Sequence, residues 1–118
     1  MLAVPVAALI LAAGAPPPAA AQRANRLIER ALAYELAGLR RPGGAEKHLF
    51  AADSVLHDAQ AILESYEYGT RQSPLSDVGL AVVADHVALA SSGPKRRAWI
   101  VKTIARTRAA LEHLRPYC

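Results

Sequence analysis

The sequence predicts an all-α protein, an up-down antiparallel four-helix bundle that follows an N-terminal signal peptide. Its 118 residues leave room for one domain, and an aromatic content of 5% favours helices over sheets. Four segments carry apolar residues at helical spacing. The links between these segments are short and contain Gly, Pro and Ser, so successive helices are expected to run antiparallel.

The first 21 residues have the pattern of a cleaved export signal. They carry no charge, and Leu2 to Ala13 form an apolar run as long as a signal-peptide core. Ala19 to Ala21 supply the small residues that a signal peptidase accepts, so we predict cleavage before Gln22 and one helical domain over 22–118. The run is shorter than the roughly 20 residues of a membrane span. Because no Lys or Arg precedes it, an uncleaved anchor and an Ala/Pro-rich tail of an intracellular protein remain alternatives.

The first two expected helices cover about 22–40 and 45–68. Their apolar faces consist of Ala24, Leu27, Ile28, Ala31, Leu32, Leu36 and Leu39 in the first, and of Leu49, Ala52, Val55, Leu56, Ala59, Ile62, Leu63 and Tyr66 in the second. The link between them stops the first helix, because Pro42 disfavours helix in the residue before it and the following glycines permit positive φ. Gly69 is expected to end the second helix.

The third and fourth expected helices cover about 74–90 and 94–115, after a loop over 70–72. Ser73 fits an N-cap with Pro74 at the first helical position, and Ser76 is an alternative cap. The apolar members of the third helix are Val78, Val82, Val83, Val87 and Leu89. Its valines and Gly79 are poor helix formers, so Leu80 to Val83 could pass for a strand, but the sequence offers no second strand to pair with it. The fourth helix has the strongest pattern, with an apolar face of Trp99, Ile100, Thr103, Ile104, Thr107, Ala110, Leu111 and Leu114.

The fourth expected helix is strongly basic. We define its basic ridge as Lys95, Arg96, Arg97, Lys102, Arg106 and His113. The second helix is acidic and the whole chain has a net charge of +4, so alternating charge can simply pair the helices and keep the surface soluble. Alternatively, the ridge binds an anionic partner. Cations at the start of a helix are disfavoured by its dipole, which favours the second interpretation slightly.

Three polar residues interrupt or border the apolar faces. Glu35 lies in the middle of the first face, His86 in the middle of the third, and His48 at the edge of the second. Bundles build metal sites from inward-facing side chains, so these three could form one zinc or iron site. A structural contact of Glu35 with a histidine or an arginine is the simpler alternative, because a buried carboxylate needs a partner. On the exposed face of the second helix, Asp53 and His57 at i and i+4 could clip a cation or form a weak surface pair.

Motifs for catalysis are absent from the sequence: it has no Gly-rich phosphate loop, no His-Glu-x-x-His and no nucleophile elbow. The single cysteine, Cys118, excludes an intramolecular disulfide but could link two chains in an oxidising compartment. We therefore expect a non-enzymatic binding protein without a cofactor, periplasmic or secreted, whose basic ridge contacts an anionic envelope surface or an acidic protein partner. A metal- or cofactor-binding bundle holding zinc or iron and a cytoplasmic nucleic-acid-binding protein are the alternatives. The wide apolar arc of the third helix also permits a homodimer.

Overall fold

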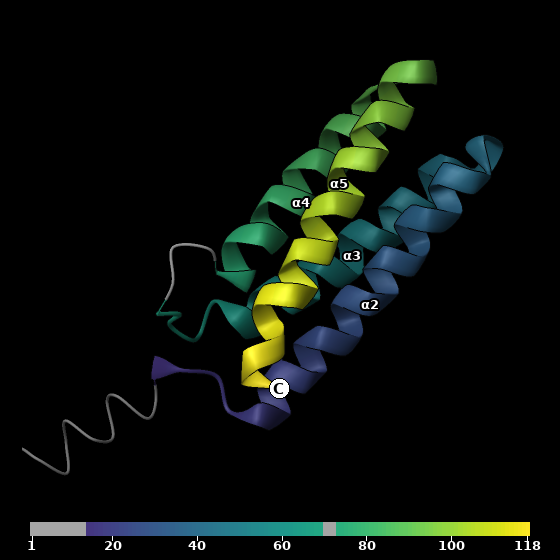
Figure 1. Cartoon of the computed structure of the whole chain (residues 1–118). Helices are drawn as coiled ribbons and strands as arrows, with labels where there is room; N and C mark the ends of the chain where they lie inside the picture. The colour runs from purple at the N-terminus through teal and green to yellow at the C-terminus, as the bar shows by residue number, and fades with distance from the viewer. Residues whose placement is uncertain (1–13, 70–72) are drawn as a thin grey trace, which may run out of the picture.

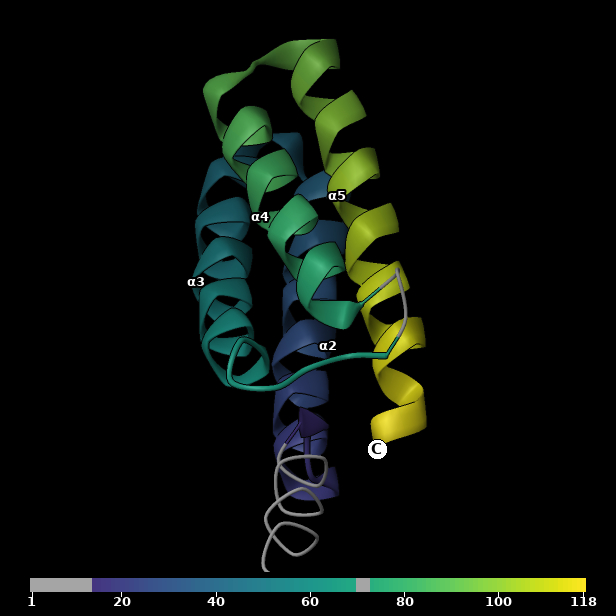
Figure 2. The same ribbon diagram turned by 90° about the vertical axis from the view of Figure 1, so that its left-hand side faces the viewer.

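The computed structural model describes residues 14–69 and 73–118 and confirms the predicted up-down four-helix bundle (Figure 1). Its helices are α2 (Pro18–Arg40), α3 (Ala45–Leu63), α4 (Pro74–Ala90) and α5 (Gly93–Leu114), with the short 3-10 turns η1 (Pro42–Gly44) after α2 and η2 (Arg115–Tyr117) after α5. Each helix packs against the next, and α5 closes the ring by packing against α2, as the view in Figure 2 shows. The described residues contain no strand.

Helix α2 begins at Pro18, four residues before the expected start at Gln22. Ala20 and Ala21 are buried in its first turn, and the Ala21 N–H donates to the Pro17 carbonyl over 3.0 Å. The proline run starts the helix here, because a proline in the first turn has no N–H to leave unsatisfied. The apolar run of residues 2–13 lies outside the described residues, and cleavage before Gln22 stays a prediction. None of the described helices is both long and apolar enough to span a bilayer.

Helix α3 ends at Leu63, five residues before the expected end at Tyr68, and Gly69 is therefore not its C-terminal cap. The Tyr68 hydroxyl donates to the Leu63 carbonyl over 2.9 Å, and the Tyr66 N–H donates to the same oxygen over 3.2 Å. The Tyr68 ring also packs edge-on against Tyr117, with ring centroids 5.4 Å apart. These contacts satisfy the last carbonyl of α3 and direct the chain out of the helix. The expected loop over 70–72 lies outside the described residues.

Helices α4 and α5 match the expected segments closely. The Ser73 hydroxyl accepts a hydrogen bond from the Ser76 N–H over 3.0 Å, which confirms Ser73 as the N-cap of α4. Residues 80–83 are helical, so the strand alternative is wrong. The turn into α5 requires Gly93, whose φ of 57° lies in the left-handed region that favours glycine.

The core consists of two apolar clusters, one towards each end of the bundle. The larger contains Ile28, Leu56, Leu63 and Leu114, and the smaller contains Leu49, Ile100 and Ile104, with alanines at many contact positions. Between them along α2, α4 and α5 lies a layer of fully buried polar side chains, consisting of Glu35, Asp85, Thr103 and Thr107. This polar layer places two carboxyl groups and two hydroxyl groups in the middle of an otherwise apolar bundle.

Candidate functional site

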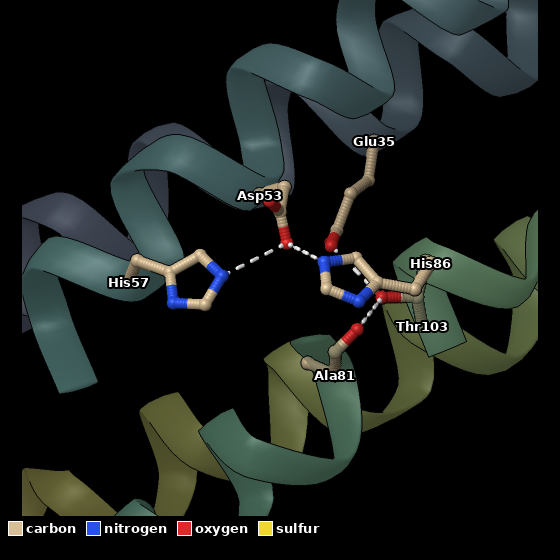
Figure 3. Close-up of polar contacts among 6 residues, drawn as sticks. All are labelled: Glu35, Asp53, His57, Ala81, His86 and Thr103. Carbon is tan, nitrogen blue, oxygen red and sulfur yellow. Dashed lines mark hydrogen bonds and ion pairs between the residues drawn. The ribbon is translucent and has the colours of Figure 1, made fainter. Parts of the chain in front are cut away.

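The buried carboxyl of Glu35 contacts a threonine hydroxyl in the polar layer. Thr103 Oγ1 lies 3.0 Å from Glu35 Oε2 and 3.0 Å from the Ala81 carbonyl oxygen (Figure 3). A hydroxyl has one proton to donate, so it can serve only one of these two acceptors. A protonated Glu35 that donates to Thr103, which in turn donates to Ala81, satisfies all three groups. Glu35 is buried, as its place in the middle of the apolar face predicted, but its polar contact is with Thr103 and not with the expected histidine or arginine.

Asp85 forms a second buried carboxyl beside Glu35, and we call the two residues the acidic pair. With both carboxyls ionised, Glu35 Oε1 and both carboxyl oxygens of Asp85 have no hydrogen-bond donor within residues 14–69 and 73–118. Burial raises the pKa of both groups, and the negative charge of Glu35 raises the pKa of Asp85 further. Protonation of either carboxyl removes the repulsion between the two charges. The acidic pair is therefore protonated more readily than an exposed carboxyl.

His86 lies on the outside of the bundle, so its expected place in the middle of an apolar arc is wrong. Its side chain is 56% exposed, whereas the preceding Asp85 faces the core. The prediction placed the inner face of α4 on its valines. Of these valines, Val78 and Val82 are buried as predicted, but Val83 is exposed. The rest of the buried face includes Ala81, Ala84, Asp85 and Ala88, because small side chains let the helices approach closely.

The exposed His86 joins two residues of α3. Its Nε2 lies 2.9 Å from Asp53 Oδ1, and the Nε2 of His57 lies 3.5 Å from the same oxygen (Figure 3). Within the described part of the chain, this is the one group of three potential metal ligands whose donor atoms converge, all within 4.8 Å of one another. Asp53 and His57 were predicted as a pair from the sequence, and His86 was considered separately. The packing of α3 against α4 brings all three together.

His48 belongs to neither group. It is half-buried in the first turn of α3, next to Gly38 and Gly44 at the end of the bundle where η1 lies. The expected set of Glu35, His48 and His86 is therefore split between the core, one end of the bundle and its outer surface. These three side chains therefore do not converge on one metal ion.

Half of the basic ridge contacts the protein itself. Arg96 donates through Nε to the Ala88 carbonyl (3.0 Å) and through Nη2 to the Leu89 carbonyl (3.1 Å), so it caps the C-terminus of α4. Arg97 donates to a carbonyl of α2, and His113 pairs with Asp77 at the start of α4. Arg96 lies at the C-terminus of α4, where the helix dipole favours a cation. Its position in the first turn of α5 therefore does not require a binding partner.

Lys95, Lys102 and Arg106 are exposed, as is Arg97. Lys102 and Arg106 border a groove between α4 and α5 with a volume of about 600 Å³, which we call the α4–α5 groove. Its lining consists of Leu80, Val83, Ala84, Trp99, Lys102, Ala105 and Arg106. Lys102 Nζ lies 4.1 Å from the centroid of the Trp99 ring, at cation–π distance.

Sequence reasoning missed the two buried aspartates of α4, Asp77 and Asp85. A signal for them exists in the sequence, because Asp77, Ala81, Asp85 and Ala88 follow one another at three or four residues, the spacing of one helical face. The predicted apolar face of α4 was based on its valines, so the two aspartates were not assigned to the core.

Searches against protein-family models, curated proteins and solved structures find no match for this chain. The structure itself defines the class, an all-α four-helix bundle with a buried polar layer.

Proposed function

We propose that this chain is a small, exported, non-enzymatic interaction protein that binds an acidic amphipathic helix of a partner protein in the α4–α5 groove. The observation that carries the proposal is the combination of exposed apolar side chains and exposed cations in one groove. Leu80 is 45% exposed and Val83 is 58% exposed, and Lys102 and Arg106 stand beside them.

The apolar lining of the groove suits an amphipathic helix. An amphipathic helix recognised in this way inserts its apolar stripe between two helices of the receptor and leaves its polar edge at the rim. Leu80 and Val83 come from α4, and Trp99 from α5, so apolar groups line both walls. The Trp99 ring adds the type of anchor that contributes most at protein interfaces.

The charge of the groove selects an acidic partner. Lys102 and Arg106 stand four residues apart on α5 and therefore project from the same face. Both are exposed, unlike Arg96, which is committed to the end of α4. Carboxylates spaced by one helical turn on the partner would match this pair, and such complementarity raises the association rate and the specificity.

Photo-crosslinking in cells tests the location of the partner. A photoreactive residue is placed at Val83, inside the groove, and as a control at Phe50, which is also 58% exposed but lies on α3. We expect a discrete crosslinked product with another protein from Val83 and none from Phe50.

The other possible occupants give different results. A product with the mass of two chains would mean a homodimer, and crosslinking to lipid together with sedimentation on phosphatidylglycerol vesicles would mean a membrane surface. Binding to DNA or RNA that weakens steeply with salt would support the cytoplasmic alternative. Each of these results, or the same product from Phe50, contradicts the proposed acidic helix.

A further inference from the structure

Two imidazoles and a carboxylate from adjacent helices converge at the surface between α3 and α4. We propose that Asp53, His57 and His86 form a binding site for a divalent transition metal ion such as Zn²⁺. This site is independent of the α4–α5 groove and of the partner proposed for it.

The geometry is close to what a metal ion requires. Zinc binds histidine nitrogen and carboxylate oxygen at about 2.0–2.2 Å, so ligand atoms around a tetrahedral ion lie roughly 3.3–3.6 Å apart. Asp53 Oδ1 is 2.9 Å from the His86 nitrogen and 3.5 Å from the His57 nitrogen, and no two ligand atoms are more than 4.8 Å apart. Small side-chain rotations therefore suffice to place one ion among them, because both histidines are about half exposed and free to adjust.

The chemistry of the set selects the class of ion. Imidazole nitrogen suits zinc, copper, nickel and ferrous iron, whereas calcium and magnesium prefer oxygen ligands. Three protein ligands leave a fourth position open for water or another group. His57 and Asp53 share one helix face at i and i+4, and His86 enters from α4, so the ion would also tie two helices together.

The surroundings favour a cation at this place. Asp53 is close enough to the buried Asp85 for its charge to raise the pKa of that carboxyl. A divalent ion bound there would compensate the negative charge of Asp53, which otherwise opposes ionisation of Asp85. A bound ion would replace the direct contact between the His86 nitrogen and Asp53 Oδ1, which lie 2.9 Å apart.

Calorimetric titration with Zn²⁺ tests the site. The full chain is used without a histidine tag, with Cys118→Ser in every variant so that the thiol cannot bind the ion, and it is first stripped with a chelator. His57→Ala and His86→Ala are compared with His48→Ala, which removes a histidine of α3 that lies outside the cluster. We expect one Zn²⁺ per chain. Loss of a second-shell partner already weakens binding 10–100-fold, so either ligand variant should lose at least about tenfold, while His48→Ala binds as the parent does.

Cobalt supplies a second readout, because Co²⁺ in a tetrahedral nitrogen and oxygen site absorbs visible light and hydrated Co²⁺ absorbs little. The parent and His48→Ala should show this absorption, and His57→Ala should not. His57 is exposed and distant from the core, so the variant is expected to fold, which circular dichroism checks. Absence of saturable Zn²⁺ binding by the parent, or equal binding by all three histidine variants, would overturn the proposal.

Discussion

The Thr103 hydroxyl lies 3.0 Å from a carboxyl oxygen of Glu35, although the two residues are 68 positions apart in the chain. This contact joins α5 to α2 through the centre of the bundle, at a point where both side chains are fully buried. A polar contact of this kind fixes the relative height of two helices, because sliding either helix leaves a buried polar group unsatisfied.

The acidic pair should make the protein less stable as the pH rises. Burial raises the pKa of Glu35 and Asp85 above their unfolded values, so between those values the folded chain binds more protons than the unfolded chain. The contribution of the pair to stability is therefore complete below the unfolded pKa values of 4.5 and 3.8, and it is lost as the pH rises to the folded pKa values of about 7 for Glu35 and about 8 for Asp85. We expect melting temperatures followed by circular dichroism to fall by at least about 4 °C between roughly pH 5 and pH 8.5. Asp85→Asn should flatten this dependence; an unchanged slope in that variant would refute the assignment.

Replacement of Thr103 by Val should destabilise the bundle more than the same change at Thr107. Thr103 serves Glu35 and Ala81 on two other helices, whereas the Thr107 hydroxyl donates to the Thr103 carbonyl on its own helix. Leaving a buried polar group unsatisfied costs about 1–3 kcal/mol, so we expect a loss in that range for Thr103→Val and a clearly smaller loss for Thr107→Val. Urea denaturation measures both losses. Because Thr107 also lies near enough to Glu35 to lower its pKa, the comparison tests the additional contact of Thr103 with Ala81 of α4, and equal losses would contradict the prediction.

Arg96 should contribute to stability although it belongs to a basic surface ridge. Its two hydrogen bonds satisfy carbonyls at the end of α4. Hydrogen bonds to charged groups are worth about 1.5–3 kcal/mol, and partial exposure reduces this value, so we expect Arg96→Ala to lower the unfolding free energy by about 1–2 kcal/mol. Lys95→Ala, at the exposed neighbouring position, is the control and should change it by less than about 0.5 kcal/mol.

Two glycines should respond in opposite directions to replacement by alanine. Gly93 has a φ of 57°, where an alanine costs roughly 1–2 kcal/mol. Gly79 lies inside α4, and an added Cβ there would meet nothing within 4 Å, so alanine should stabilise the helix by up to about 1 kcal/mol. Thermal melts of the two variants provide the measurement. Stabilisation by Gly93→Ala would show that the turn before α5 differs from the one described.

The fold could be predicted because it depends on local signals. Helical periodicity, the Ser73 cap and the glycine-containing links specify where α4 and α5 begin and end, and each acts within a few residues. The end of α3 could not be predicted in this way, because it depends on the contact of Tyr68 with Tyr117, which lies far away in the sequence.

The candidate sites were harder to predict, because they depend on the rotation of each helix. A single helix pattern identified Glu35 as buried, since apolar residues surround it on both sides of the face. For α4 both Val82 and Val83 fit an apolar face, and deciding which of them is buried required knowledge of how the neighbouring helices pack. The rotation of α4 decides whether Asp85 or His86 points inward. It therefore also decides which residues form the buried polar layer and which form the surface cluster with Asp53 and His57.

The most direct test of the proposed function is the yield of the Val83 crosslink after charge reversal at the groove. Lys102→Glu combined with Arg106→Glu is compared with Arg26→Glu combined with Arg30→Glu, another pair of exposed cations four residues apart, located on α2. Both variants change the net charge equally and should fold as the parent does. We predict that the crosslink is lost in the first variant and retained in the second. Retention of the crosslink in both, with normal folding, would contradict the recognition of an acidic helix by this groove.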